Sequence, residues 1–204
     1  MRLGIFGGTF DPPHIGHLIL TDEVIHQMEL DLVYWVLTPY PPHKTDQYIS
    51  PLDQRITMLQ AAIGDDEKNQ LSYVDIDRPE PHYSSDTVKI FRENFPHDNL
   101  VFLMGGDSIH DLPLWHKPFE LLEYCDSIAV MKRPGYEFDL LDMESKIPGL
   151  SPKVNIIEAP LISISSHSIR ERVHCGRPYK WLLPKKVYEL IEKNSYYIQS
   201  LKKS

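Results

Sequence analysis

"LGIFGGTFDPPHIGHL", residues 3–18, opens the chain with an apolar run, a pair of glycines and two histidines. The run Leu3–Phe6 predicts a strand, and the chain from His17 onward has the apolar spacing of an amphipathic helix. Gly7 and Gly8 let backbone N–H groups approach a ligand without interference from a Cβ atom. The free N–H groups and the positive dipole end of a helix attract anions. The stretch therefore predicts a strand, a glycine turn and a helix start that bind phosphate.

His14 and His17 fall on the same side of the first helical turn if Ile15–Leu18 begin the helix, so both rings can donate to phosphate oxygens. Gly16 allows equally close approach at the helix start. Two histidines also suit a transition metal, although no cysteine or acidic partner at ligand spacing lies nearby. A structural histidine pair at a turn needs no ligand at all. The dinucleotide fingerprint G-x-G-x-x-G and the Gly-Lys-Ser/Thr phosphate loop are absent from this stretch.

Short apolar runs alternate with segments of helical period along the chain, which is typical of βαβ units around a parallel sheet. The predicted strands are Leu3–Phe6, Leu32–Leu37, Leu71–Ile76, Leu100–Met104, Ser127–Met131 and Val154–Glu158. The predicted helices are His17–Met28, Leu52–Ile63, Ser85–Asn94, Pro118–Tyr124, Ser168–Val173 and Pro184–Lys193. We expect Ser50 to cap the second helix, with Pro51 in its first position. The pattern predicts an α/β fold with a doubly wound parallel sheet.

Right-handed crossovers place the carboxyl ends of parallel strands on one edge of the sheet, where open α/β sheets bind ligands. The segment ends at this edge are Gly7, Pro39, Gly105 and Arg133. Most of the chemically suggestive residues of the chain follow these ends.

Composition limits the classes of protein that the chain can represent. Its 204 residues predict one domain, or one domain with a small appendage, and 42% hydrophobic and 25% charged residues are ordinary for a soluble globular protein. A net charge of -8 argues against a nucleic-acid-coating surface. Cys125 and Cys175 match no zinc spacing, and no signal peptide or membrane-spanning apolar run is evident. We therefore expect a cytoplasmic protein without nucleic-acid or membrane partners.

"ISSHSIRER", residues 164–172, predicts a second anion site. Ser165 and Ser166 are natural N-cap residues, and Ser168 adds another hydroxyl. Arg170 lies one turn into the helix, so its guanidinium can converge with the hydroxyls on phosphates. A serine-capped surface helix with a solvated arginine is the alternative, which these residues alone leave open.

Five further stretches follow predicted strands and could select or orient a second substrate. "PPHK", residues 41–44, offers His43 and Lys44 to a phosphate. "YSSDT", residues 83–87, combines hydroxyls with a helix N-terminus, which suits a carboxylate. Asp107 in "MGGDS", residues 104–108, can accept hydrogen bonds from ribose hydroxyls.

"LPLWHK", residues 112–117, offers the face of Trp115 to a flat ring. Lys132 and Arg133 end the fifth predicted strand, and Arg133 could lie over an adenine or near its phosphates. Each residue also has a structural interpretation: Asp107 as a helix cap, Trp115 in the core, Lys44 and Arg133 as solvated charges.

Two of the stretches resemble known signatures. "GGTFDPPHIGHL" resembles the H-x-G-H signature of small adenylyl- and cytidylyltransferases and, more distantly, of class I aminoacyl-tRNA synthetases, whose form is the literal "HIGH" of residues 14–17. "ISSHSIR" resembles the I-S-S-T-x-I-R signature of nicotinate-nucleotide adenylyltransferases. A synthetase would also carry K-M-S-K-S and a tRNA-binding domain, and the chain has neither. The other stretches are similar to the adenylyltransferase pattern in order and separation, from Gly4 to "YKWLLPKKVYELIEKNSYY".

This resemblance implies a Rossmann-like nucleotidyltransferase fold, with residues 1–204 as a single domain whose small C-terminal helical part begins at about 163. The reaction implied is adenylyl transfer from ATP to nicotinate mononucleotide, by in-line attack without a covalent enzyme intermediate. The nucleotide phosphate is already ionised at neutral pH, so no general base is needed. Mg²⁺ is expected on the triphosphate, held mainly by phosphates and water. A homodimer or larger homo-oligomer is compatible with the sequence, which carries no interface signature.

The resemblance also implies roles for individual residues. It assigns catalysis to His14, His17 and Arg170. It assigns ATP binding to Gly7, Gly8, Thr9, Phe10, His14, Gly16, His17, Lys132, Arg133, Ser165, Ser166, His167, Ser168, Ile169 and Arg170. It assigns nicotinate mononucleotide binding to His43, Lys44, Tyr83, Ser84, Thr87, Gly105, Gly106, Asp107, Leu114 and Trp115. Two positions depart from the family pattern: His167 stands where the family has Thr, which leaves open whether the His167 ring, Ser166 or Ser168 makes that contact, and Ser84 stands where many relatives have Thr.

Overall fold

The computed structural model describes residues 1–41, 48–64, 66–132, 139–160 and 162–198. Its strands form one parallel sheet in the order β3-β2-β1-β4-β5-β6. They are β1 (Arg2–Gly8), β2 (Leu32–Leu37), β3 (Asn69–Ser72), β4 (Asn99–Gly105), β5 (Ser127–Met131) and β6 (Val154–Ile157). This is the strand order of the Rossmann-type doubly wound sheet, so the predicted fold class is confirmed.

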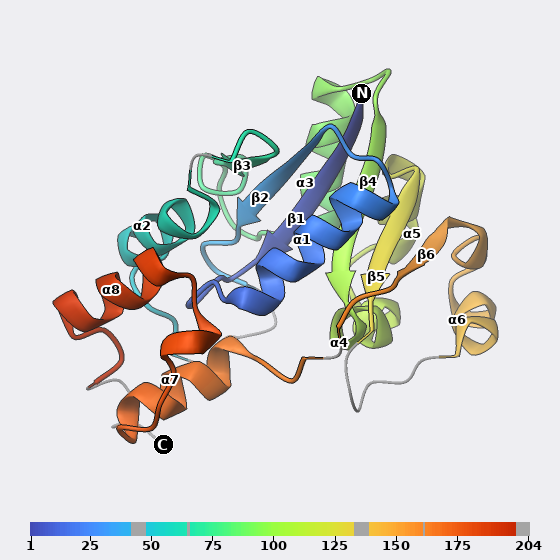
Figure 1. The fold of residues 1–204 in the computed structure, drawn as a ribbon. Helices are drawn as coiled ribbons and strands as arrows, with labels where there is room; N and C mark the ends of the chain where they lie inside the picture. The colour runs from blue at the N-terminus through green and yellow to red at the C-terminus, as the bar shows by residue number, and fades with distance from the viewer. Residues whose placement is uncertain (42–47, 65, 133–138, 161, 199–204) are drawn as a thin grey trace.

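Helices cover both faces of the sheet (Figure 1). The helices are α1 (Ile15–Gln27), α2 (Leu52–Ile63), α3 (Ser84–Asn94), α4 (Gly106–Asp111), α5 (Pro118–Tyr124), α6 (Leu140–Lys146), α7 (Ser166–His174) and α8 (Lys185–Asn194). Short 3₁₀ turns lie at Leu112–Leu114, Ser151–Lys153 and Lys180–Leu182. No helix within the described ranges is long and apolar enough to cross a membrane.

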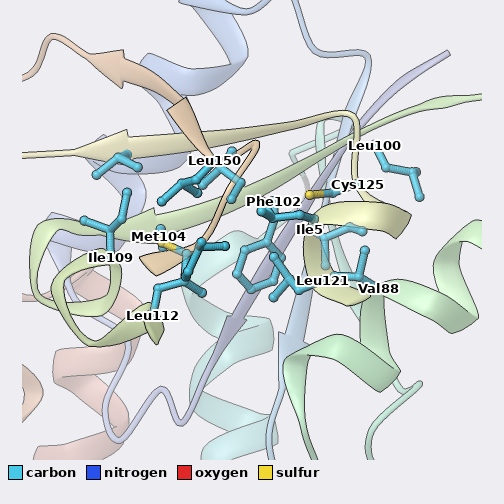
Figure 2. Packing of buried hydrophobic residues seen from close by; sticks show 14 of the residues in the cluster. Ile5, Val88, Leu100, Phe102, Met104, Ile109, Leu112, Leu121, Cys125 and Leu150 are labelled. Atoms are coloured by element: carbon cyan, nitrogen blue, oxygen red, sulfur yellow. The ribbon is translucent and has the colours of Figure 1, made fainter. Parts of the chain in front are cut away.

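The central strands read as near-continuous apolar runs because both of their faces are buried. Side chains such as Ile5, Phe102 and Leu121 form the core under α3, α5 and α6, and Figure 2 shows them gathered there. Phe6 and Trp35 belong to the core under α1 on the opposite face. A third cluster packs α7 and α8 against α2, through residues that include Met58, Ile169, Val187, Ile191 and Tyr197. The C-terminal helices are therefore attached by apolar contact to the helix that follows β2.

The sequence placed the third strand wrongly. The expected strand is Leu71–Ile76, whereas the observed strand β3 is Asn69–Ser72. The chain then turns, and the Asp77 N–H donates to the Tyr73 carbonyl at 2.9 Å. Val74 and Ile76 are apolar because they pack against the two cores from this turn, on opposite sides of the sheet. Apolar residues in a turn therefore gave the composition of a strand.

The expected cap at Ser50 is also wrong. Pro51 is the N-cap residue of α2, and no side chain caps this start. The backbone N–H of Ser50 instead donates to Asp11 Oδ2 at 3.0 Å, a partner that local sequence cannot reveal. The short helices α4 and α6 were not predicted.

The expected carboxyl edge is present. The registers Gly8 with Leu37 and Gly105 with Met131 bring the ends of β1, β2, β4 and β5 to the same side of the sheet, with Pro39 just beyond β2. Arg133 lies outside the described residues. Because β1 is central and the order reverses between β1 and β4, a crevice for ligands is expected at that point.

The two cysteines differ in their surroundings. Cys125 is buried in the core, and burial raises the pKa of its thiol to about 12, whereas Cys175 is exposed. The thiolate is the reactive form. We expect an excess of a water-soluble thiol reagent to label only Cys175 in the folded protein and both cysteines after unfolding. Counting labelled thiols by mass spectrometry checks this, with Cys175→Ser as control, and rapid labelling of Cys125 in the folded protein would contradict it.

Candidate active site

The two histidines form one unit at the start of α1. His14 is the buried N-cap residue and His17 lies in the first turn, and the two residues form a reciprocal capping box. The backbone N–H of His14 donates to Nδ1 of His17 at 3.1 Å, and the two rings stack with centroids 3.6 Å apart. Since Nδ1 of His17 accepts this bond, its proton belongs on Nε2 in the neutral ring. His17 therefore has a hydrogen-bond donor directed away from its own helix start.

An aromatic wall fixes the orientation of the His17 ring. Phe6, Phe10 and Trp35 lie with ring centroids 5.8, 5.2 and 6.5 Å from that of His17, tilted or edge-on to it. The indole N–H of Trp35 donates to the Asn69 side chain at 2.7 Å, which locks the wall in place. The histidine unit is thus held by packing as well as by hydrogen bonds, which suits a group that must be preorganised.

Two glycines make this packing possible. A Cβ atom at Gly16 would lie 3.1 Å from Nδ1 of His14, and one at Gly8 would lie 2.9 Å from the Phe10 ring. The space beside Gly7 is open, since a Cβ there would meet nothing within 4 Å. The glycines therefore serve close packing of the rings, and Gly7 leaves room beside the end of β1.

Helix α7 returns to this turn from the other end of the chain. The hydroxyl of Ser166 donates to the Pro12 carbonyl at 2.8 Å, and Nη1 of Arg170 donates to the Asp11 carbonyl at 2.7 Å, across 159 positions. The two predicted anion sites are therefore brought together. Arg170 is partly buried and hydrogen-bonded, so the alternative of a solvated surface arginine is wrong.

The serines at the start of α7 serve the helix itself. Ser165 Oγ accepts from the Ser168 N–H at 3.1 Å, and Ser168 Oγ donates to the Ser165 carbonyl at 2.9 Å, as parts of a capping box. Ile169 is buried in the third cluster, whereas His167 is exposed on the first turn.

The start of α3 lies on the other face of the sheet. Thr87 is buried, and its hydroxyl donates to Asp75 Oδ1 at 2.7 Å and lies 3.2 Å from Nη2 of Arg78. Thr87 therefore braces the loop before α3. Ser84 begins the helix, and the N-cap residue Tyr83 makes no side-chain bond to the first turn.

The loop after β4 lies beside the start of α3. The ring of His116 stacks on Tyr83 with centroids 3.9 Å apart, which joins this loop to the α3 start. Trp115 is half-buried, with its ring edge-on to Phe102 at 6.3 Å, and Leu114 is 86% exposed. Gly105 and Gly106 lead from β4 into α4, which also contains Asp107.

Three predicted residues, His43, Lys44 and Arg133, lie outside the described residues. Lys132 is exposed just after β5. Among the described residues, no group of three or more His, Cys, Asp or Glu side chains could hold a metal ion.

Arg55 is not among the residues that the sequence predicts for the site. It is 2% exposed, and its guanidinium donates to the backbone carbonyls of Ser50, Thr9, Thr38 and Pro39 at 2.8–3.2 Å. The signal available was its spacing, because Arg55 shares the buried face of α2 with Met58 and Leu59. An arginine on an apolar face marks a buried network.

Comparison with known proteins agrees with this geometry. The cytidylyltransferase-like family model matches residues 5–172. The chain is 40% identical over 196 residues to the "Probable nicotinate-nucleotide adenylyltransferase" of Thermomicrobium roseum, covering 96% of this chain and 91% of that protein. It is 38% identical over 196 residues to the nicotinate-nucleotide adenylyltransferase of Bacillus subtilis, covering 96% and 98%.

Solved structures support the fold. The Plasmodium falciparum nicotinic acid mononucleotide adenylyltransferase complexed with NaAD superposes with a TM-score of 0.79 at 21% identity, covering 96% of this chain and 97% of that one. The same enzyme complexed with APC gives a TM-score of 0.78. The histidine turn and the arginine helix that docks on it agree with the full-length similarity to curated relatives. The chain therefore belongs to the cytidylyltransferase-like family and, within it, to the nicotinate-nucleotide adenylyltransferases.

Proposed function

We propose that this enzyme transfers the adenylyl group of ATP to nicotinate mononucleotide, forming nicotinate adenine dinucleotide and pyrophosphate. The observation that carries the proposal is the docking of α7 on the histidine turn, because it brings Arg170 to the segment that carries His14 and His17, at the end of β1. The names of the curated relatives support the same reaction.

In this proposal the ATP phosphates lie at the α1 side of the crevice. The open space beside Gly7 admits them, while Nε2 of His17 and the guanidinium of Arg170 donate to their oxygens. The hydroxyls of Ser166 and Ser168 already donate to the carbonyls of Pro12 and Ser165. The exposed ring of His167 is therefore the better candidate for the contact that Thr makes in the family pattern. Lys132, just after β5, is a proposed contact of the nucleotide, and the same role is proposed for Arg133, which lies outside the described residues.

Nicotinate mononucleotide would lie at the α3 side. Trp115 stacks on the pyridine ring, and the start of α3 at Ser84 receives the carboxylate through backbone N–H groups. His43 and Lys44 hold the mononucleotide phosphate. Gly105, Gly106 and Asp107 lie between the two sides, at the end of β4, where a ribose would pass.

The chemistry requires alignment more than proton transfer. A phosphate oxygen of the mononucleotide forms a bond to the α-phosphorus of ATP, and the bond from that phosphorus to pyrophosphate breaks. The attacking oxygen is ionised near neutral pH because the second pKa of a phosphate monoester is about 6. Mg²⁺ bound to the triphosphate would neutralise part of the charge, with phosphates and water as its main ligands. The side chains of the enzyme hold and align the two anions.

The substrate prediction is tested by pyrophosphate release from ATP with nicotinate mononucleotide, nicotinamide mononucleotide or phosphopantetheine as acceptor. We expect release with nicotinate mononucleotide, because Trp115 and the start of α3 suit an aromatic carboxylate. The proposal fails if this acceptor gives no signal while either of the others does.

Replacement of His17 tests the proposed binding of the ATP phosphates by His17 and Arg170. We expect His17→Ala to lower turnover at least ~100-fold, the scale for loss of one transition-state donor. The variant also loses a bond at the helix start, worth about 1 kcal/mol, and it remains folded. Steady-state kinetics and thermal unfolding measure the two effects. His26→Ala, exposed in the last turn of the same helix, is the matched control, and wild-type turnover in His17→Ala would remove His17 from the mechanism.

Replacement of Trp115 tests the pyridine side. Stacking of a base on an aromatic ring contributes about 1–3 kcal/mol, so Trp115→Ala should lower kcat/KM for nicotinate mononucleotide about tenfold or more. Binding of an ATP analogue, measured by calorimetry, should stay near the wild-type affinity. Trp181→Ala, whose ring is exposed near the C-terminus, should change neither quantity. Equal losses in the two variants would contradict the assignment of Trp115.

A further inference from the structure

The carboxylate of Asp11 is buried inside the turn that carries the histidines. It is 2% exposed, and its two oxygens accept hydrogen bonds from the Tyr197 hydroxyl at 2.8 Å and from the Ser50 N–H at 3.0 Å. The carbonyl of the same residue accepts the bond from Arg170. A buried carboxylate is costly unless it is paired and hydrogen-bonded, so these donors restrict where Asp11 can lie.

Tyr197 reaches this carboxylate from the segment beyond α8. Its side chain is buried in the third cluster, and its backbone adopts a left-handed φ of 68°, which is unfavourable for a non-glycine residue. Burial, followed by the negative charge of Asp11, raises the pKa of the Tyr197 hydroxyl well above its usual value. The hydroxyl therefore keeps its proton and donates to Asp11 throughout the pH range in which the protein works.

On its other side, Asp11 is connected to Arg55 through the backbone of one residue, Ser50. The Ser50 N–H donates to Asp11, and the Ser50 carbonyl accepts from Nε of Arg55 at 2.9 Å. Desolvation lowers the pKa of Arg55, and the charge of Asp11 opposes that shift. The guanidinium also holds Thr9, beyond β1, and Thr38, beyond β2, by their carbonyls. One buried network thus joins the C-terminal segment to the loops at the ends of both strands.

We propose that Tyr197, Asp11 and Arg55 are positioning residues, through which the C-terminal segment sets the geometry of the histidine turn. Asp11 lies three residues before His14, and its carbonyl accepts the bond from Arg170. A shift of the Asp11 carboxylate would therefore move both the histidine turn and Arg170, which are proposed to bind the ATP phosphates. These three side chains are buried beneath the turn. They therefore act on alignment rather than by contact with substrate.

Removal of the Tyr197 hydroxyl tests whether the buried network positions the histidine turn. The kinetic part of this test rests on the proposed function. Tyr197→Phe keeps the buried ring and removes the hydroxyl, and with it the bonds to Asp11 and to Sδ of Met58. Since misplacement of reacting groups by about 1 Å can cost about 100-fold, we expect kcat to fall about 10- to 100-fold. KM for ATP should change much less, because the groups that bind phosphate remain present. Tyr196→Phe, at the adjacent position, should retain wild-type kcat and KM.

Assays are run at a temperature at which circular dichroism shows both variants to be folded, so that lost stability does not lower kcat. Arg55→Lys attacks the other end of the network, since an ammonium group cannot bond the same set of carbonyls as a guanidinium. We expect the same lowered kcat with KM for ATP little changed. Wild-type kcat in folded Tyr197→Phe, or an equal loss in Tyr196→Phe, would overturn the proposal.

A second measurement needs no substrate. The ring ¹⁵N and ¹H signals of His14 and His17 in the free protein report the geometry of the turn directly. Tyr197→Phe should shift these signals and leave those of the exposed His26 and His97 in place, whereas Tyr196→Phe should shift none of them. Unchanged His14 and His17 signals in Tyr197→Phe would refute the network. If the wild-type enzyme did not use nicotinate mononucleotide, the proposed function would fail while this measurement still decided the role of Tyr197.

Discussion

The reversal of strand order between β1 and β4 is the constraint on which the site depends. Because β1 leads into a helix on one face and the chain after β4 packs on the other, the two connections diverge at the carboxyl ends of these strands, where such sheets bind ligands. The histidine unit lies on the α1 side of that divergence, and Tyr83 and Trp115 lie on the α3 side. A reaction that joins two nucleotides needs two subsites facing one point, and the proposed function places them on either side of this divergence.

The C-terminal helices complete one side of the site. Apolar contacts attach α7 and α8 to α2, and two hydrogen bonds from α7 then reach the turn after β1. The apolar contacts are nondirectional and supply most of the attachment, whereas the bonds from Ser166 and Arg170 fix the register. The family model ends at residue 172, yet Tyr197 reaches back to Asp11 from beyond that limit. The segment after the matched region is therefore structurally continuous with the site.

Local sequence predicted those features that local forces determine. The bounds of β2, β5, α2 and α5 agree with the apolar patterns because burial on a strand or helix follows its own period. The predictions at β3 and Ser50 were wrong because distant partners decide them: apolar residues pack from a turn in one case, and Asp11 takes the Ser50 N–H in the other. The signatures pointed to two stretches that the structure brings together. The contact between these two stretches could not be predicted from the sequence, because its acceptors are backbone carbonyls, which every residue carries.

The proposed chemistry explains why buried groups remote from the substrates should matter. The acceptor phosphate is already ionised and no covalent enzyme intermediate is proposed, so the enzyme has little to add except charge neutralisation and geometry. Charge neutralisation requires side chains that reach the phosphates, and in the proposed function Arg170 supplies positive charge while His17 adds a hydrogen-bond donor. Geometry depends instead on whatever fixes the backbone beneath those side chains. In this chain that support is the buried carboxylate of Asp11. One of its oxygens accepts from the Tyr197 hydroxyl and the other from the N–H of Ser50, whose carbonyl is bonded by Arg55.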